Sequence, residues 1–408
     1  MSEEETDRAI VTPVRSQGFL AGLLGGPAVL GLAARTGARL ARRSGRPFRI
    51  GKRVIAARHD HVRELLVRDL EFGIAAVNAV KIGEVNDGPF ILGMDRSGAL
   101  EKERRALYAA LSGVDMARLR QSVTTGIAER LDAIPAGGTI DAVGGYARPI
   151  AARTAQLLFG ITGPNDAMFM EVVRSVFAHT FLNQSDDPLV RERGIKAGRY
   201  MGEWLAEEIA RRRSVGDFGE DMMGTLLRQG LLDDDGVRRT LGGMLVGSID
   251  TTATCVAKIM KVADADPELR FAMRRDRDEP AKMDGWCNEA LRRWPHNPIV
   301  IRRAVRDATL GGRDVSAGDG VIAWTHAAMH DPDVFPDPRR LRPDREPSAY
   351  LHLGGGLHPC SGRPVNRFQI PMLVGALLGR EPCRIGRIRW AGPFPHRLDV
   401  TVGKGPAR

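Results

Sequence analysis

Leu353-Gly354-Gly355-Gly356-Leu357-His358-Pro359-Cys360-Ser361-Gly362 is the stretch of sequence on which the interpretation of this chain depends. It follows a coil rich in Pro, Asp and Arg and precedes a helical pattern at about 363–378. The glycines allow the backbone to approach something flat, and Cys360 falls near the N-terminus of the predicted helix, a position that favours a thiolate. A Gly-rich turn with a buried structural cysteine is an equally good interpretation of this stretch alone.

Composition places the chain among ordinary globular proteins. Of its 408 residues 43% are hydrophobic and 27% are charged, so a large core is possible, either in one helical fold with a buried cofactor or in two or three domains. The net charge is +10, but the basic residues are scattered through helical patterns without interleaved aromatic residues. This argues against a nucleic-acid-binding surface and favours an acidic protein partner or an anionic cofactor.

The cysteines and the N-terminus indicate the compartment. Cys255, Cys287, Cys360 and Cys383 form no CxxC pair, so we expect neither a zinc site nor a disulfide framework. The acidic start, Met1-Ser-Glu-Glu-Glu5, is unlike a secretory signal, and a cytoplasmic location follows as the expectation. Residues 17–34 carry no charge but are interrupted by Gly25-Gly26-Pro27, so we expect a buried or surface-docked segment and no stable membrane insertion.

Helical periodicity dominates the chain and predicts a mainly α protein with small sheets. Asp233, Asp234 or Asp235 can cap one long central helix that runs to about residue 264, with apolar or small residues at three- and four-residue steps. The other expected elements are strands at about 49–57 and 299–304, helices at 61–67 and 283–294, and a long ordered loop at 76–99. No linker composition divides the chain, which predicts an N-terminal segment, 1–48, and one domain, 49–408.

The cysteine loop resembles that of the cytochromes P450, whose usual pattern is Phe-Gly-x-Gly-x-His/Arg-x-Cys-x-Gly. Five of its six fixed positions are matched, by Gly354, Gly356, His358, Cys360 and Gly362. The resemblance implies a P450 fold that binds haem b, iron protoporphyrin IX, with Cys360 as the ligand of the iron and the other four residues beside the cofactor. A thiolate ligand donates electron density to the iron and helps to cleave the O–O bond. Leu353 replaces the phenylalanine and removes an aromatic shield near the sulfur.

A second matching motif is Glu289-Ala-Leu-Arg292, which resembles the Glu-x-x-Arg helix of the family. The two side chains lie one helical turn apart and can pair, although such a pair is commonplace on protein surfaces. The family adds an arginine from the downstream coil, and Arg340 of Phe335-Pro-Asp-Pro-Arg-Arg340 takes that place. The implied role is structural, to lock the coil that leads to Cys360.

The third motif, Gly247-Ser-Ile-Asp250-Thr251-Thr252, is similar to the oxygen-activation motif of the family, Ala/Gly-Gly-x-Asp/Glu-Thr. An acid beside an alcohol, Asp250 and Thr251, can relay protons. Ser248 occupies the position at which the family usually has glycine. Its side chain would narrow the groove beside this part of the helix or make that groove more polar. The alternative is that these polar side chains only solvate one helix face, with the hydroxyls bonded back to the preceding turn.

The resemblance also implies cations for the two haem propionates, and Arg104, Arg302 and His358 are the candidates. The family motif near residue 100 is His-x-x-x-Arg, of which Arg104 is kept and the histidine is Leu100. Each candidate can equally be a solvated basic residue, the default in so basic a chain.

Partners follow from the same resemblance. We expect a separate ferredoxin or flavodoxin-type electron donor, attracted by basic residues around the cysteine loop, although some of these can instead pair internally. These residues are Arg339, Arg342, Arg345, Arg363 and Arg367. The regions expected to line the substrate pocket are 76–94, 177–183, Met244, Ile299 and Val300, mostly apolar, which favours a small, largely apolar substrate or a plain core position for each residue.

The sequence as a whole therefore predicts a haem-thiolate monooxygenase, an iron-binding oxidoreductase that hydroxylates or otherwise oxidises its substrate. Three alternatives stay open. The chain can be a haem protein of this fold without turnover, with a ligand-binding or scaffold role, as Leu353, Leu100 and Ser248 suggest. It can be a haem-thiolate enzyme that uses peroxide, or a thiol enzyme in which Cys360 works with His358.

Overall fold

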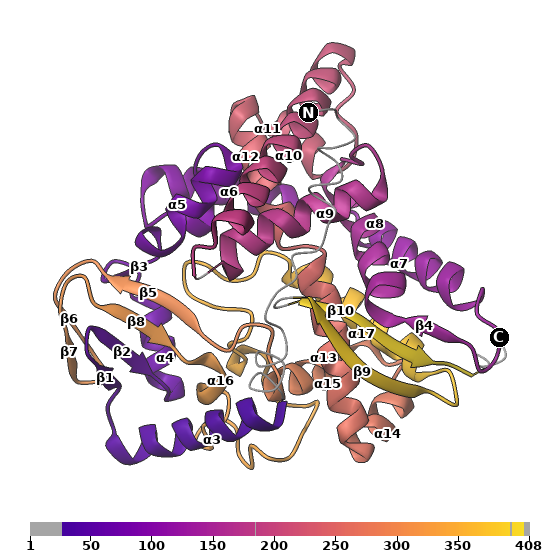
Figure 1. Cartoon of the computed structure of the whole chain (residues 1–408). Helices are drawn as coiled ribbons and strands as arrows, with labels where there is room; N and C mark the ends of the chain where they lie inside the picture. The colour runs from indigo at the N-terminus through magenta and orange to yellow at the C-terminus, as the bar shows by residue number, and fades with distance from the viewer. Residues whose placement is uncertain (1–26, 184, 392–393, 404–408) are drawn as a thin grey trace.

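The computed structural model describes residues 27–183, 185–391 and 394–403. The longer helices are α3 (Pro27–Ser44), α4 (His59–Val67), α5 (Ala75–Asn86), α6 (Gly98–Ser112), α7 (Met116–Leu131), α8 (Arg148–Phe159), α9 (Asp166–Phe177), α10 (Pro188–Val215), α11 (Met222–Gln229), α12 (Asp234–Val246), α13 (Asp250–Ala265), α14 (Pro267–Arg275), α15 (Pro280–Arg293) and α17 (Arg363–Leu378). Short helical turns are η1 (Ile91–Gly93), η2 (Ala142–Ala147), η3 (Ala178–Leu182), α16 (Thr325–Ala328) and η4 (Pro347–Ala349). Helices form the bulk of the molecule, which confirms the mainly α prediction (Figure 1).

The strands of the described residues form three small sheets. They are β1 (Phe48–Ile50), β2 (Arg53–Ala56), β3 (Phe72–Gly73), β4 (Thr139–Asp141), β5 (Val300–Ala304), β6 (Ala308–Leu310), β7 (Arg313–Val315), β8 (Gly320–Ala323), β9 (Arg384–Ala391) and β10 (Phe394–Thr401). The five-stranded sheet has the order β1-β2-β8-β5-β3, with only β2 and β8 parallel, and it lies apart from the β4-β10-β9 sheet (Figure 1). The larger hydrophobic core lies among α7 to α15 and α17, and a smaller core packs the five-stranded sheet against α4.

The predicted loop at 76–99 is wrong over its first half, because residues 75–86 form α5. The Asp95 carboxylate accepts hydrogen bonds from the backbone N–H groups of Ile74 (2.6 Å) and Ala75 (3.0 Å) and so satisfies the start of the helix. Asp87, with a left-handed φ of 45°, ends it. The capping residue lies 20 residues downstream of the helix start, so no local pattern could indicate it.

The predicted long central helix is likewise wrong in one respect, because it is broken between α12 and α13. The two ends of the helix lie where they were predicted. Asp233 caps the start by accepting a hydrogen bond from the N–H of Gly236, and Asp266 follows the last residue of α13. At the break Gly247 caps α12, and both the N–H and the hydroxyl of Ser248 donate to the carbonyl of Leu245 (3.0 and 2.7 Å). These bonds to the preceding turn replace the regular helical bonds and place Asp250 at the start of α13.

The helices on either side of the cysteine loop were predicted well: α17 spans 363–378 and α15 spans 280–293. Of the apolar segment 17–34, residues 17–26 lie outside the described residues, and the rest belongs to α3. This helix packs on α16, where Gly37 lies against the ring of Trp324. In the part of the chain that the structure describes, no helix is both long and apolar enough to cross a bilayer.

Candidate functional site

Cys360 lies just before α17 and lines a pocket together with residues that include Leu353, Pro359 and Arg363. The Cys360 N–H donates to the carbonyl of Leu353 (2.8 Å), which closes the loop. The residue keeps accessible surface, yet surrounding protein atoms desolvate the thiol. This burial raises the thiol pKa, and the backbone N–H groups of Gly362 and Arg363, which point at Sγ, act in the opposite direction. A sulfur with N–H donors behind it and open space in front is suited to bind a metal as a thiolate, since metal binding removes the proton.

Two glycines of the loop, Gly354 and Gly356, are required by its own backbone. Gly356 has φ of +63°, and a Cβ there would lie 1.7 Å from the carbonyl oxygen of Leu66 on α4. Gly354 has φ of +72° and lies against the carbonyl of His358, while a Cβ on Gly362 would approach Sγ of Cys360 to 3.8 Å. The close contact between loop and helix is thus a second reason for glycine at position 356, beside its predicted place next to the cofactor.

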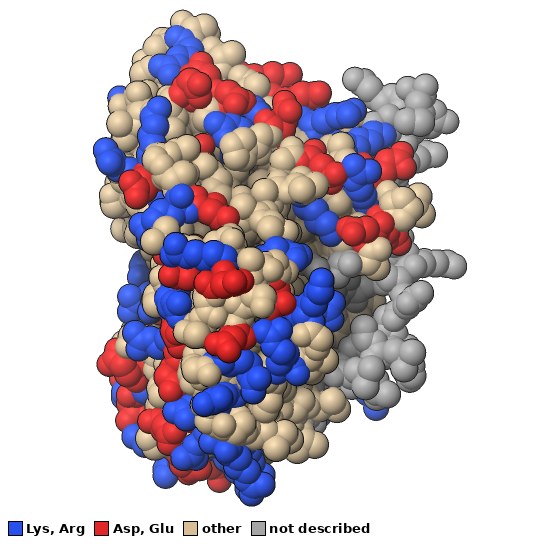
Figure 2. Space-filling model, turned by 90° about the vertical axis from the view of Figure 1, so that its left-hand side faces the viewer, with Lys and Arg blue, Asp and Glu red and all other residues tan. Residues whose placement is uncertain are grey.

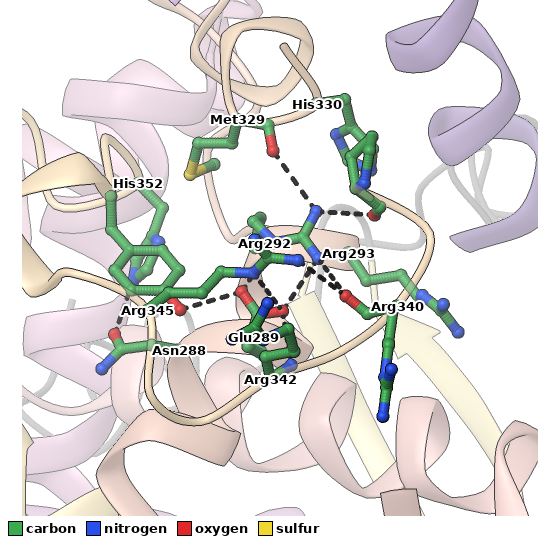
Figure 3. A network of polar contacts seen from close by, with 12 residues as sticks. Asn288, Glu289, Arg292, Arg293, Met329, His330, Arg340, Arg342, Arg345 and His352 are labelled. Atoms are coloured by element: carbon green, nitrogen blue, oxygen red, sulfur yellow. Dashed lines mark hydrogen bonds and ion pairs between the residues drawn. The ribbon is translucent and has the colours of Figure 1, made fainter. Parts of the chain in front are cut away.

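Glu289 on α15 is the centre of a buried polar network (Figure 3). Its Oε1 accepts from Nε of Arg292 (2.7 Å) and from the hydroxyl of Tyr350 (2.8 Å). Its Oε2 accepts from Nη2 of Arg292 (2.9 Å), the N–H of Arg342 (3.0 Å) and Nε of Arg345 (3.2 Å). Both Glu289 and Arg292 have side chains with 0% exposure, so this is no ordinary surface pair. Burial alone would raise the pKa of the Glu289 carboxyl, but the hydrogen bonds and charge of Arg292, together with the hydrogen bonds from Arg342 and Tyr350, outweigh burial and lower it.

The third member of this cluster is Arg345, and the assignment to Arg340 is wrong. The side chain of Arg340 points away from Glu289, and the residue contributes only its carbonyl, which accepts from Arg292 (3.4 Å) and Arg345 (2.9 Å) (Figure 3). Arg345 also donates to the carbonyls of Pro336 and Asp337. The two buried arginines thus bind the coil that leads to the cysteine loop, and Arg345 is removed from the proposed basic patch.

The three residues predicted to bind the haem propionates lie close to one another beside the cysteine loop. They are Arg104, Arg302 and His358. Arg302 is 6% exposed, and in the described part of the chain its guanidinium donates only to the carbonyl of Ile301 (2.9 Å). Burial without an ion-pair partner lowers the pKa of Arg302 to about 10. Arg104 donates to the carbonyl of Leu357 and lies over the ring of Tyr108 at 5.2 Å.

His358 shares this positively charged environment. Burial, and then the charges of Arg302 and Arg104, lower its pKa to about 4, and its buried Nδ1 has no partner among the described residues. The nearest carboxylates are already used, since Asp95 caps α5 and Asp69 pairs with Arg96 (2.6 Å). The buried Arg302 and the partly buried Arg104, without a counter-ion among the described residues, fit a ligand that carries carboxylates, as haem does.

Asp250 lies at the break between the two central helices and is 3% exposed. Its Oδ1 accepts from Nε of Arg148 on α8 (3.0 Å) and from Nη2 of Arg174 on α9 (2.6 Å). Its Oδ2 is buried and has no partner among the described residues. The carboxylate is therefore fixed on one side and free to accept a proton or a hydrogen bond on the other. No local pattern indicated Arg148 or Arg174, because they lie 102 and 76 residues away.

The hydroxyl groups beside Asp250 bond back along the helix, as in the alternative interpretation. Thr251 donates to the carbonyl of Gly247, and Thr252 donates to that of Ser248 (3.0 Å). Thr252 is buried, whereas Thr251 is partly exposed next to the exposed Gly247. A donor in this position can turn from the carbonyl toward a bound ligand, so the back-bonding does not remove Thr251 from the candidates.

Some residues of the regions expected to line the substrate pocket are buried in the core, and others are partly buried or exposed. Phe177 is buried and contacts the rings of Phe181 and Phe394 at 5.2 and 5.6 Å. Met244 is partly buried against a small apolar cluster that includes Phe90 and Leu100. Ile299 is 40% exposed, in the coil just before β5. The space-filling view of one side of the molecule shows basic and acidic side chains intermixed, in agreement with the scattered charge of the sequence (Figure 2).

A cysteine at a helix start that faces two N–H donors, with Arg302 and Arg104 unpaired beside it in the described part of the chain, fits the cysteine loop of a haem-thiolate protein. A family model described as "Cytochrome P450" matches residues 207–380, and this part of the chain is similar to that family, whose members bind haem b. It is 31% identical to the cytochrome P450 monooxygenase PikC of Streptomyces venezuelae over 66% of this chain and 63% of that protein. It is 28% identical to mycinamicin IV hydroxylase/epoxidase of Micromonospora griseorubida over 71% and 72%.

Solved structures agree on the fold. The crystal structure of CalO2 superposes with a TM-score of 0.79, 21% identity, and coverage of 92% of this chain and 98% of that one. The structure of P450 EryK bound to erythromycin B gives a TM-score of 0.75 at 20% identity. The cytochrome P450 fold predicted from the cysteine loop is thereby confirmed.

Proposed function

We propose that this protein is a haem-thiolate monooxygenase that oxidises a small, largely apolar substrate. The observation that carries the proposal is the desolvated thiol of Cys360 with unpaired Arg302 and Arg104 beside it. Cys360 would bind the iron, and the two arginines with His358 would hold the haem carboxylates. When bound, the haem supplies the redox chemistry, in which two electrons, two protons and dioxygen convert a C–H bond to C–OH and yield one water.

The role proposed for Asp250 and Thr251 is to deliver those protons. Oδ1 of Asp250 is held by Arg148 and Arg174, so the carboxylate keeps its position while its unpartnered Oδ2 accepts and releases a proton. Thr251 would pass the proton on when its hydroxyl turns from the carbonyl of Gly247. The presence of this acid and alcohol favours the reductive cycle over direct use of peroxide.

The electron donor that we propose is a ferredoxin or flavodoxin that docks on the side of the cysteine loop. Arg363 and Arg367 are exposed at the start of α17 and would attract an acidic carrier. The buried and partly buried apolar side chains of the regions expected to line the substrate pocket support a small apolar substrate. The names of the relatives, which include a monooxygenase and a hydroxylase/epoxidase, support an oxidation. Four cysteines without a disulfide are consistent with a cytoplasmic location.

A carbon monoxide difference spectrum of the reduced protein tests the proposal directly. We expect the absorption maximum of thiolate-ligated haem, and we expect Cys360→His to shift it to that of histidine-ligated haem. Cys383→Ser, a matched change at a buried cysteine away from the loop, should leave the spectrum unchanged. Haem bound with an unaltered spectrum in Cys360→His would contradict the assignment.

Turnover separates the monooxygenase from a haem protein without activity. With NADPH and a surrogate ferredoxin system, we expect product formation to fall about 10- to 100-fold in Asp250→Asn, because Oδ2 can no longer carry a proton. Asp264→Asn, on the same helix and paired with Lys261, is the control and should keep the parent rate. Equal rates in Asp250→Asn and the parent would remove Asp250 from the relay, and no turnover with any donor would favour the ligand-binding alternative.

A further inference from the structure

Five arginine side chains line a cleft between α3 and the coil at 330–339. The cleft has a volume of about 640 Å³, and its lining includes Arg35, Arg39, Arg42 and Arg43 of α3 and Arg339 of the coil. Asp337 is the acidic residue among the lining residues. The cleft belongs to neither the cysteine loop nor the Glu289 cluster.

Most of these guanidinium groups lack a counter-ion. Within the described ranges only Arg42 pairs with a carboxylate, that of Asp333 at 2.9 Å. Burial, followed by repulsion from Arg339, Arg293 and Arg39, lowers the pKa of Arg35. His330, at the same cleft, adds no charge near neutral pH, because burial and neighbouring arginines lower its pKa to about 4. Repulsion among crowded guanidinium groups destabilises the folded protein, and a bound anion would reduce this repulsion.

We propose that this cleft is a binding site for an anion that carries several phosphate groups. Guanidinium groups from two walls can each donate two hydrogen bonds to phosphate oxygens, and planar donors of this kind suit phosphate better than lysine would. Four unpaired arginines in a space of this size require more than one phosphate to balance them. The chemistry is shared by free polyphosphates and by the headgroups of anionic lipids.

The lipid source has some support from α3 itself. Leu32 and Leu40 are 62% and 50% exposed on this arginine-rich helix. Exposed apolar side chains next to arginines are typical of helices that lie at a membrane surface. The experiment therefore has one arm for a free anion and one for lipid vesicles.

The test uses the full-length haem-loaded protein and titration calorimetry with tripolyphosphate. We expect saturable binding that weakens about tenfold or more in Arg39→Gln/Arg339→Gln, which removes one guanidinium from each wall. Arg39→Lys/Arg339→Lys keeps the charge but loses the paired donors, and it should weaken binding less. Arg384→Gln/Arg387→Gln, at exposed arginines of β9, removes the same charge and should bind as the parent does.

Vesicles of phosphatidylglycerol, with phosphatidylcholine as the neutral comparison, form the second arm. Co-sedimentation with the anionic vesicles alone, lost in Arg39→Gln/Arg339→Gln, would assign the phosphate to a lipid, whereas binding of tripolyphosphate alone would assign it to a soluble ligand. The proposal is overturned if the parent binds neither probe, or if the β9 variant loses as much affinity, since net charge would then explain binding.

Discussion

Two buried charge clusters lie near the cysteine loop, and they differ in how completely their charges are paired. In the cluster of Glu289, Arg292 and Arg345, both carboxylate oxygens and the guanidinium groups have partners. In the cluster of Arg104, Arg302 and His358, the two guanidinium groups have backbone carbonyls and the ring of Tyr108 as partners but no carboxylate among the described residues, and Nδ1 of His358 has no partner there. The complete cluster stabilises the coil, whereas the incomplete one is arranged for a ligand that brings negative charge.

The largest expected effect is on the complete cluster. Glu289→Gln leaves two buried guanidinium groups without a carboxylate, and we expect the free energy of unfolding to fall by about 3–5 kcal/mol, with poor recovery of folded protein. Urea unfolding followed by circular dichroism measures this. Arg340→Gln, whose side chain makes no contact with the cluster, should stay within about 0.5 kcal/mol of the parent. A similar loss in both variants would refute the assignment of Arg345 in place of Arg340.

A smaller effect of another kind is expected at the incomplete cluster. Arg302→Gln should leave the stability of the apoprotein unchanged or higher, because no ion pair is lost. It should speed haem loss roughly 10- to 100-fold, the equivalent of a charge-assisted hydrogen bond of about 1.5–3 kcal/mol. Haem transfer to apomyoglobin gives the rate, with the adjacent exposed Arg303→Gln as control. If Arg302→Gln destabilised the apoprotein as Glu289→Gln does, the contrast between the clusters would be lost.

The smallest effect concerns pH. The folded-state pKa of His358 is lowered to about 4, below the value of about 6.5 in an unfolded chain, so as pH falls the unfolded state takes up the proton first. The apoprotein should therefore lose stability progressively between about pH 6.5 and 4, and His358→Gln should reduce that slope. Thermal unfolding across this range checks it, with the exposed His396→Gln as control. An unchanged slope in His358→Gln would show that burial and the charges of Arg302 and Arg104 do not hold the histidine neutral.

Local patterns were sufficient where the chemistry is local. The start of α17 just after Cys360, the pairing of Glu289 with Arg292 one turn away, and the cap of the central helix at Asp233 all depend on residues within a few positions of one another. Local patterns did not predict those features that depend on a residue far away in the sequence. Asp95 caps α5 from the far end of a loop, and Arg148 and Arg174 reach Asp250 from two other helices.

The coil between Phe335 and Arg345 shows the same limit at short range. Several arginines follow Phe335, and their order in the sequence does not reveal which side chain turns inward. The folded coil places Arg345 against Glu289 and leaves Arg340 pointing away. The sequence is compatible with Arg345 either on the surface around the loop or in an internal pair, and the structure selects the internal pair with Glu289.

Periodicity and short motifs are properties of neighbouring residues, so the helical class, the cysteine loop and the family resemblance can be predicted without a structure. Only the tertiary structure decided which arginines are paired and which are left without a counter-ion, where the central helix breaks, and that α3 and a distant coil form an arginine-lined cleft. The physical reason is that burial and charge compensation depend on groups brought together from far along the chain, and no local pattern encodes that distance.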